Sequence, residues 1–455
     1  MRLTGKERVL TALLGITAAS ALTTLILILV EATNVLLPTA TKFGVVLDAG
    51  SSHTSLFVYR WPADKENDTG VVSQALACRV QGPGISSFAS DPAQAGESLQ
   101  GCLQEALAAV PAAQHSGTPV FLGATAGMRL LSRKNSSQAA GIFAAVAQAL
   151  GRAPLDFRGA ELLPGRDEGA FGWITINYVL GLLVKCSFSG EWIRPPEGTL
   201  VGALDMGGAS TQITFVPGGP VQDESSQATF RLYGFQHGVY THSHLCFGRD
   251  QALSRLLARL VPSSLVRHPC YHSGYRDTLS LARLFESPCV QGTAPPHLPP
   301  NLTVEGTGNP SACVAAIREL FNFSRCEGRG DCAFNGVYQP PVRGQFYVEE
   351  LSAGQDSRLS NYCASGLYIL TLLVDGYGFS EHTWPSIEFR KQAGGTDIGW
   401  TLGYMLNLTN MIPAEAPAQW RAQSYGIWVA GVTFVVLTLG AILAAAAALL
   451  LWPRD

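Results

Sequence analysis

A short turn near residue 50 carries side chains that could hold a phosphate group and a metal ion. Residues 44–61 read as a β-rich apolar run, an Asp, a Gly/Ser turn and a second β-rich run, which predicts a strand, a tight turn and a returning strand. Gly50 permits a close backbone approach, and Asp48 at the strand end can hold a hydrated divalent cation. Further donors in the turn are Ser51, Ser52, His53 and Thr54. The pattern is also typical of a plain hairpin, so on its own it does not decide between a phosphate site and a hairpin.

The same pattern recurs at residues 201–216, again between apolar runs. The matched positions are Asp48 and Asp205, Gly50 and Gly207, and Thr54 and Thr211. A duplicated strand, D-x-G turn and strand predicts two related lobes, each presenting a backbone loop to one ligand in the cleft between them. A polyphosphate is the natural ligand for two such loops.

Two further residues could act beside such loops. Thr125 follows a short strand predicted at 119–122, where its hydroxyl could reach a phosphate. The small residues there are equally explained by a turn that packs closely against its neighbours. Asp167 and Glu168 precede an apolar-patterned helix, and acidic residues at a helix start are favoured by the helix dipole. Glu168 is also a candidate base, because hydrolysis of a phosphoanhydride needs a carboxylate that orients and deprotonates water.

The composition bounds the architecture and the partners. With 455 residues, 47% of them hydrophobic and 14% charged, the chain can form two cores. The net charge is -3 and no run of Lys or Arg occurs, so nothing indicates nucleic acid. His237, His242 and His244 lack companion ligands at a recognised spacing, which favours surface histidines over a metal site.

Two apolar segments predict membrane spans. Residues 9–30 and 427–452 contain no charged residue, and each is long enough to cross the hydrocarbon core as a helix. The first could be a cleavable signal peptide, but its apolar run is too long, so we expect a retained anchor. Basic residues precede it and Glu31 follows it, which places the N-terminus in the cytoplasm. The predicted order is cytoplasmic residues 1–8, an outer region at 31–426 and cytoplasmic residues 453–455.

All ten cysteines lie between the two predicted spans, as do five glycosylation sequons. The sequon asparagines are Asn67, Asn135, Asn301, Asn322 and Asn407. Their confinement to the predicted outer region indicates an oxidising compartment, in which disulfides are the default over metal ligands. Cys326 and Cys332 are expected to close a small loop.

Five ordered motifs resemble the ecto-nucleoside triphosphate diphosphohydrolases, or ecto-apyrases, over nearly the whole chain. They read VVLDAGSSHTSLFVYRW at 45–61, GATAGMRLL at 123–131, DEGAFGWITINYVLG at 167–181, ALDMGGASTQITF at 203–215 and DIGWTLGYMLN at 397–407. The chain is most similar to the cell-surface subgroup, and within it to the canalicular hepatic type. The resemblance implies an α/β ectodomain of two actin-like lobes between two transmembrane helices. Lobe I would comprise about 43–180 plus a C-terminal segment, and lobe II about 200–395.

The resemblance also implies a function. Members of this family hydrolyse extracellular ATP, ADP, UTP and UDP to monophosphates, with Ca²⁺ or Mg²⁺, and regulate purinergic signalling at the plasma membrane; a homo-oligomer is compatible with this. By the family pattern Glu168 is the catalytic base, and Asp48 and Asp205 hold the metal through water. Phe379 falls near the aromatic that stacks on the base, although such a ring can also belong to a core. The other positions matched to phosphates or the attacking water are Ser51, Ser52, His53, Thr125, Gly207, Gly208, Ala209, Ser210 and Gln212.

One departure from the family pattern follows residues 344–347. Related chains continue there through an aromatic-rich helical stretch with a further cysteine, whereas this chain reaches Cys363 directly, as an omitted exon would leave it. The family pattern pairs Cys78 with Cys102, Cys246 with Cys289, Cys270 with Cys313, and Cys326 with Cys332. Cys186 and Cys363 are then left as free thiols. Because a lost disulfide and lost core structure cost several kcal/mol, a catalytically impaired variant is the alternative to an active enzyme. A third alternative, an adhesion or receptor ectodomain, is disfavoured by the intact phosphate loops.

Overall fold

The structure, a computed structural model, divides the chain into two compact units. One unit is Thr41–Ala414, and the other combines Met1–Ala40 with Glu415–Asp455. The unit Thr41–Ala414 is shorter than the outer region predicted at 31–426, because the residues next to the terminal helices belong to the unit that contains those helices. The structure describes residues 4–29, 33–36, 40–186, 192–193, 196, 198–261, 265–290, 292, 295, 299–328, 330–349, 361–415, 419–422 and 425–451.

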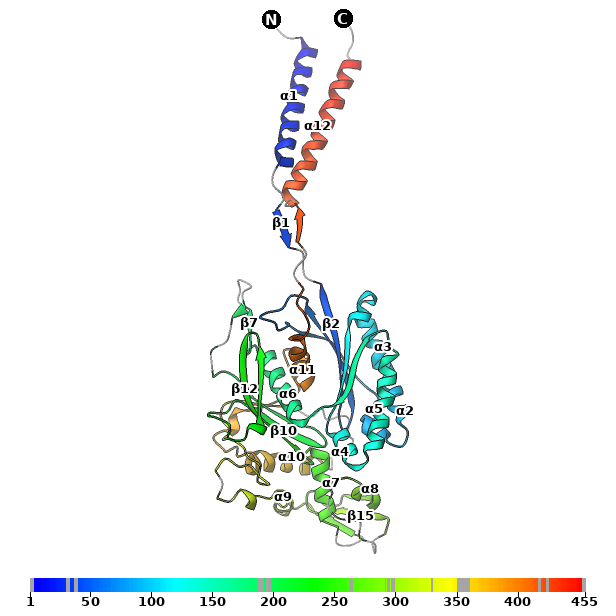
Figure 1. Cartoon of the computed structure of the whole chain (residues 1–455), viewed down its shortest axis with the longest axis vertical. Coiled ribbons are helices and arrows are strands. Elements are labelled where there is room, and N and C mark those ends of the chain that lie inside the picture. Colours follow the sequence, from blue (N-terminus) through cyan, green and yellow to red (C-terminus); the bar gives the residue numbers. More distant parts are fainter. Residues whose placement is uncertain are drawn as a thin grey trace. The chain divides into compact units, whose positions relative to one another are not determined.

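The terminal unit contains two long apolar helices. α1 (Gly5–Leu29) and α12 (Tyr425–Leu451) are each long and apolar enough to cross a membrane, and they pack against each other (Figure 1). Between these helices and the rest of the chain, β1 (Thr33–Leu36) pairs antiparallel with β20 (Gln419–Ala422). The two spans predicted from the sequence correspond to α1 and α12 within a few residues.

Lobe I is built on a five-stranded sheet. Its strands, in spatial order, are β4 (Ser73–Arg79), β3 (Thr54–Pro62), β2 (Thr41–Ala49), β5 (Pro119–Ala124) and β6 (Asp156–Leu162). β2 pairs antiparallel with β3 and parallel with β5, which pairs parallel with β6. Val45 and Leu47 of β2 enter one core and Val46 enters another, so both faces of the sheet are covered. The helices of this lobe are α2 (Pro92–Ser98), α3 (Gln100–Ala109), α4 (Ala126–Lys134) and α5 (Ser136–Gly151).

Lobe II repeats this arrangement. Its six-stranded sheet has the order β11 (Gln227–Leu232), β12 (Phe235–Leu245), β10 (Ser210–Phe215), β9 (Gly202–Met206), β16 (Phe346–Glu349) and β17 (Ile387–Arg390). β9 pairs antiparallel with β10 and parallel with β16, which pairs parallel with β17. A hairpin followed by two parallel strands therefore occurs twice, which confirms the duplication predicted from the two D-x-G turns.

The smaller elements of lobe II complete the fold. They are α7 (Arg249–Arg259), β13 (Leu265–His268), β14 (Arg276–Ser280), α8 (Leu281–Phe285), β15 (Asn301–Gly306), α9 (Pro310–Arg318) and α10 (Tyr362–Thr371). The short pairs β7 (Lys185–Cys186) with β8 (Trp192–Ile193) and β18 (Gln392–Ala393) with β19 (Thr396–Asp397) lie outside the two large sheets.

Among the described residues, the structure forms the four disulfides that the resemblance implies. They are Cys78–Cys102, Cys246–Cys289, Cys270–Cys313 and Cys326–Cys332. Cys363 is an exposed free thiol, as predicted, whereas the Cys186 side chain lies outside the described residues.

The sequon asparagines differ in exposure. Asn67, Asn135, Asn301 and Asn322 are exposed, and Asn407 is half-buried within α11 (Trp400–Thr409). Glycosylation of all five stays a prediction.

The prediction of surface histidines is wrong for two of the three. His237 and His244 are buried, because β12 is an interior strand covered on both faces. The His244 ring stacks on Phe334 with ring centroids 4.3 Å apart, and burial holds the pKa of His244 well below its usual value. His244 is therefore a neutral core residue.

The helix that carries Glu168, α6 (Gly165–Val179), packs closely against α11. A side-chain carbon placed on Gly403 of α11 would lie 2.0 Å from the Phe171 carbonyl oxygen of α6. The Gly403 amide also donates a hydrogen bond of 2.8 Å to the Thr175 hydroxyl. Glycine is needed here because the two backbones approach too closely for any side chain.

We expect Gly403→Ala to destabilise the protein by about 3 kcal/mol and to lower its Tm by several degrees, because α6 and α11 must separate. Thermal unfolding followed by tryptophan fluorescence measures the change. The control is Gly101→Ala in α3, where an added carbon meets open space and helix propensity favours alanine by up to about 1 kcal/mol. Equal Tm values for the two variants would contradict the packing argument.

Candidate active site

The two D-x-G turns lie directly against each other. The first joins β2 to β3 and the second joins β9 to β10, so each carboxylate sits near the end of an interior strand. A side-chain carbon placed on Gly208 would lie 2.8 Å from the Ser51 hydroxyl oxygen and 2.8 Å from a carboxylate oxygen of Asp250. The structure therefore brings together the two loops that were predicted to share one ligand.

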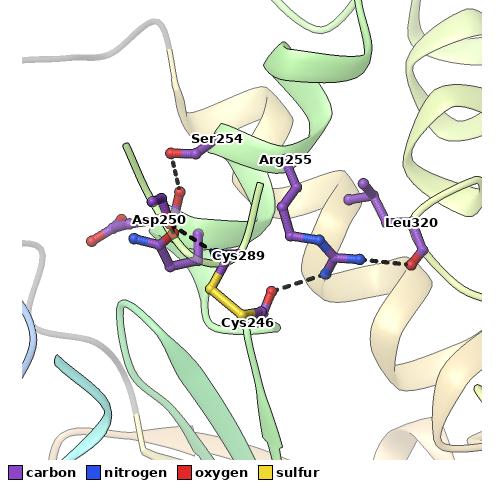
Figure 2. Close-up of a disulfide and its surroundings, with 8 residues drawn as sticks. Cys246, Asp250, Ser254, Arg255, Cys289 and Leu320 are labelled. Atoms are coloured by element: carbon purple, nitrogen blue, oxygen red, sulfur yellow. Dashed lines mark hydrogen bonds between the residues drawn. A yellow bond between two sulfur atoms is a disulfide. The ribbon is translucent and has the colours of Figure 1, made fainter. Parts of the chain in front are cut away.

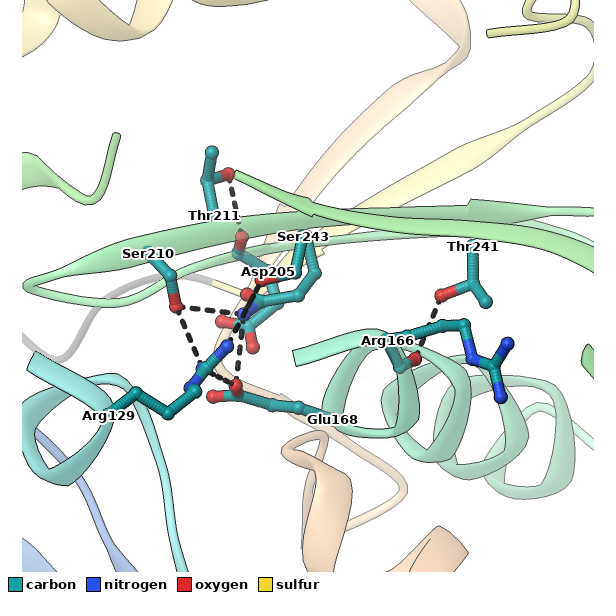
Figure 3. A network of polar contacts seen from close by, with 9 residues as sticks. Arg129, Arg166, Glu168, Asp205, Ser210, Thr211, Thr241 and Ser243 are labelled. Carbon is teal, nitrogen blue, oxygen red and sulfur yellow. Dashed lines mark hydrogen bonds and ion pairs between the residues drawn. The ribbon is translucent and has the colours of Figure 1, made fainter. Parts of the chain in front are cut away.

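Glu168 lies in the first turn of α6 and is only 7% exposed. Its Oε2 accepts a hydrogen bond of 3.0 Å from the Gln212 side-chain amide, whose nitrogen also lies 2.9 Å from Ser210 Oγ (Figure 3). Gln212 and Ser210 are themselves buried in β10. The predicted base is thus next to the two polar side chains predicted to surround the attacking water.

Sequence reasoning missed Arg129, which forms a buried ion pair with Glu168 (Figure 3). Its Nη2 contacts Glu168 Oε2 and lies 3.2 Å from Ser210 Oγ, and its Nη1 lies 3.4 Å from Ser243 Oγ. A signal was present, since Arg129 follows Thr125 by one helical turn within a motif already singled out. Ser243 gave no signal, because only the strand register places it opposite Gln212.

Three carboxyl groups lie at this site, of which Glu168 is buried and Asp48 and Asp205 are half-buried. Burial raises the pKa of Asp48 to about 7, and the negative charge of Asp205 adds to the rise. Burial raises the pKa of Glu168, against the opposing effect of the Arg129 charge, and it also raises the pKa of Asp205. Such crowding of carboxylates favours a cation between them.

A divalent cation fits the carboxylate pair. The Asp48 Oδ1 atom is buried and makes no hydrogen bond to the protein, so one acceptor remains available beside Asp205. Within the described ranges, no group of three or more His, Cys, Asp or Glu side chains could hold a metal ion directly. Water molecules would therefore complete the coordination shell, as hydrated Ca²⁺ and Mg²⁺ allow.

The remaining predicted phosphate contacts lie around the same point. Thr125 is buried immediately before α4, and its amide donates a hydrogen bond of 3.1 Å to the Ala49 carbonyl. Ser52 Oγ lies 3.0 Å from His53 Nδ1, and burial lowers the pKa of His53. The contact between Thr125 and Ala49 keeps the first turn next to the N-terminal end of α4, and the N-terminus of a helix can bind an anion.

Phe379 does not lie where a base could stack on it. Its side chain is 2% exposed and packs edge to face against Phe346 with ring centroids 4.9 Å apart. The base-binding role predicted for Phe379 is therefore not supported, because the ring belongs to the core of lobe II.

A largely apolar cavity of about 390 Å³ adjoins Asp205 and was not predicted. Besides aliphatic side chains, its walls include Asp205, Arg249, Thr211, Tyr362, Tyr377 and Phe389. The Tyr362 side chain is about half exposed at the start of α10. An aromatic ring and a guanidinium beside a polar edge suit a flat heterocycle joined to a charged group.

Taken together, the duplicated lobes, the facing turns, the paired carboxylates and the buried glutamate define a two-lobed actin-like protein with a candidate site for a phosphate chain. The chain belongs to the GDA1/CD39 (nucleoside phosphatase) family, which it matches over residues 34–353 and 347–421. A bovine (Bos taurus) ectonucleoside triphosphate diphosphohydrolase 8 is 68% identical over 496 aligned residues, covering 100% of both chains. The human protein of that name is 67% identical with the same coverage, and a mouse ectonucleoside triphosphate diphosphohydrolase 2 is 45% identical over 93% of this chain and 94% of its own.

A solved structure supports the fold. The crystal structure of nucleoside triphosphate hydrolases from Neospora caninum superposes with a TM-score of 0.57, covering 91% of this chain and 99% of that chain. The identity is 15%, so this similarity concerns the fold alone.

The alignments also locate the missing stretch. The bovine alignment runs over 496 positions while this chain has 455 residues, so at least 41 positions have no counterpart here. The family match is divided at residues 347–353. The alignment length shows that a stretch is absent, and the divided family match places it after Tyr347, ahead of α10 in the chain.

Proposed function

We propose that this chain hydrolyses extracellular nucleoside tri- and diphosphates, such as ATP, ADP, UTP and UDP, to monophosphates and phosphate. The observation that carries the proposal is the position of Glu168, buried beside Ser210 and Gln212 where two facing phosphate turns meet. The names of the relatives support the substrate class. Their alignment with this chain from end to end supports an active enzyme over the impaired variant.

In the proposed reaction, different residues bind the phosphate, orient the water and accept its proton. Backbone amides of the two turns bind the phosphate oxygens, and Ser210 and Gln212 orient a water molecule toward Glu168. The Glu168 carboxylate takes a proton of that water as its oxygen attacks the terminal phosphorus; the bond from this phosphorus to the bridging oxygen breaks, and inorganic phosphate and the shortened nucleotide leave. Arg129 fixes the orientation of this carboxylate, and its charge favours the ionised form against the effect of burial.

Asp48 and Asp205 would hold a Ca²⁺ or Mg²⁺ ion through water. When bound, the ion supplies positive charge that neutralises the phosphate oxygens. The proposed setting is the plasma membrane, with 31–426 outside, both termini cytoplasmic, and purinergic signalling as the process that is regulated.

The decisive experiment measures phosphate release from ATP and ADP by intact cells that express this chain. With Ca²⁺ or Mg²⁺ we expect release above that of untransfected cells. Removal of the metal with EDTA should abolish this release, because the half-buried carboxylates of Asp48 and Asp205 then repel the phosphate chain. Restoring the metal in excess of EDTA should restore the rate. If cells that stain for the protein at the surface release no phosphate above the level of untransfected cells, the proposal is wrong.

The cavity beside Asp205 is the proposed site for the base. Tyr362→Ala should raise the KM for ATP by about tenfold or more with little change in kcat, because stacking of a base on an aromatic ring is worth about 1–3 kcal/mol. The control is Trp384→Ala, an exposed aromatic of the same lobe outside the cavity. An unchanged KM in the Tyr362 variant would place the base elsewhere.

A further inference from the structure

A second cavity in lobe II, outside the candidate active site, is lined by three arginines. Its volume is about 760 Å³, and Arg255, Arg259 and Arg325 are among its walls. Arg255 and Arg259 lie one helical turn apart on α7, and Arg325 follows α9 in the chain. Residues from five separate segments of the chain thus surround one space.

Two of these arginines are fixed by backbone carbonyls. Arg255 Nη1 donates a hydrogen bond of 2.9 Å to the Cys246 carbonyl, and its Nη2 donates one of 3.1 Å to the Leu320 carbonyl (Figure 2). The guanidinium also lies over the Phe247 ring, 4.3 Å from the ring centroid. Arg259 donates to the Glu319 carbonyl. These contacts position the groups but leave their charge uncompensated, because a carbonyl is neutral.

Carboxylates do not neutralise this cluster. Among the described residues, no ion pair joins Arg255, Arg259 or Arg325 to an acidic side chain. Glu319 is the one acidic residue among the lining residues of the cavity, and it is exposed. Burial lowers the pKa of Arg255, and the nearby charge of Arg259 adds to this. Like charges held together in a concave site favour an anion.

One wall of the cavity is connected to the second phosphate turn. Cys246 is bonded to Cys289, and both cysteines line the cavity (Figure 2). The Cys246 amide donates a hydrogen bond of 2.8 Å to the Ala209 carbonyl. Cys246, whose carbonyl accepts a hydrogen bond from Arg255, therefore also supports the loop between Gly208 and Ser210.

We propose that this cavity binds an anion bearing a phosphate or sulfate group. Planar guanidinium groups pair with the oxygens of such groups through charge-assisted hydrogen bonds. Free inorganic phosphate and the sulfate groups of a cell-surface glycan share this chemistry. Asn322, a sequon asparagine, lies on the wall of the cavity, so a glycan attached there would control access.

The test measures thermal unfolding of the purified full chain in detergent, with EDTA, at rising concentrations of inorganic phosphate. The double variant R259Q/R325Q removes two exposed guanidiniums of the cavity, so folding should be preserved. The control R158Q/R276Q removes two exposed arginines elsewhere, whose side chains are 60% and 68% exposed. We expect phosphate to raise the Tm of the wild type and the control, and to bind R259Q/R325Q about tenfold more weakly. Equal shifts in the two double variants would mean that phosphate binds elsewhere, which would overturn the proposal.

A second arm replaces phosphate with a sulfated oligosaccharide. If the oligosaccharide raises the Tm of the wild type and the control but not of R259Q/R325Q, the result would support the site and identify a glycan as the source of the anion. A third arm repeats both titrations with Asn322→Gln. A Tm shift that appears only in this variant would support the site and show that the Asn322 glycan covers it. No shift in either the wild type or Asn322→Gln, with either anion, would overturn the proposal.

Discussion

Glu168→Gln is expected to lower kcat for ATP hydrolysis by about 10²–10⁴-fold, because the amide cannot accept the proton of the attacking water. The shape of the side chain is kept, and Gln212 can still contact it at the position of Oε2. KM should change little, since Glu168 acts on the water rather than on the nucleotide. Steady-state phosphate release from purified protein measures both constants.

Asp167→Asn is the matched control for this substitution. Asp167 is the neighbour of Glu168 in the same helical turn, but its side chain is 36% exposed and pairs loosely with Arg166 at 3.6 Å. A surface pair of this kind contributes little, so the control should retain the wild-type rate. Full turnover by Glu168→Gln would show that another group is the base, even with the fold intact.

The part of the site that could be predicted from the sequence is the part encoded within single turns. Asp48, Asp205 and their glycines stand at fixed spacing between apolar runs, so strand, turn and strand follow from local physics. Glu168 could be named because it begins a helix between the two turns. The duplicated sheet topology then follows from the repeated pattern.

The features that were missed or mistaken depend on contacts between distant segments. Arg129 meets Glu168 only after α4 and α6 are placed side by side, and a basic residue on an amphipathic helix gives no sign of its partner. Phe379 and His244 were misplaced for a related reason. From the sequence alone, the position of an aromatic residue after a turn, or of a histidine in a strand, does not show whether its side chain points into a core.

The absent stretch after Tyr347 shows how a local deletion can spare the site. The strand β16 still pairs with β9 and β17, so the interior order of the second sheet is complete. The loss follows Tyr347 in the sequence, ahead of α10, in which Tyr362 and Cys363 are exposed. We therefore expect the deletion to affect base binding at the proposed cavity more than the residues around Glu168.

Arg129→Met should lower kcat/KM at pH 7 by about tenfold for each unit by which the pKa of Glu168 rises. In the wild type, burial raises this pKa and the Arg129 charge opposes the rise. Removing the charge lets the pKa rise further, and the base works only when ionised. The ascending limb of the pH profile should therefore move to higher pH, with activity partly recovered at alkaline pH.

Two comparison variants separate this effect from a general loss of structure. Arg133→Met removes an exposed arginine from the same helix and should leave the pH profile unchanged. Arg129→Lys keeps a positive charge but cannot contact Glu168, Ser210 and Ser243 with one planar group, so kcat should fall while the limb stays near its wild-type position. If the Arg129→Met profile kept the wild-type limb, the ion pair would only orient Glu168 and would not set its ionisation.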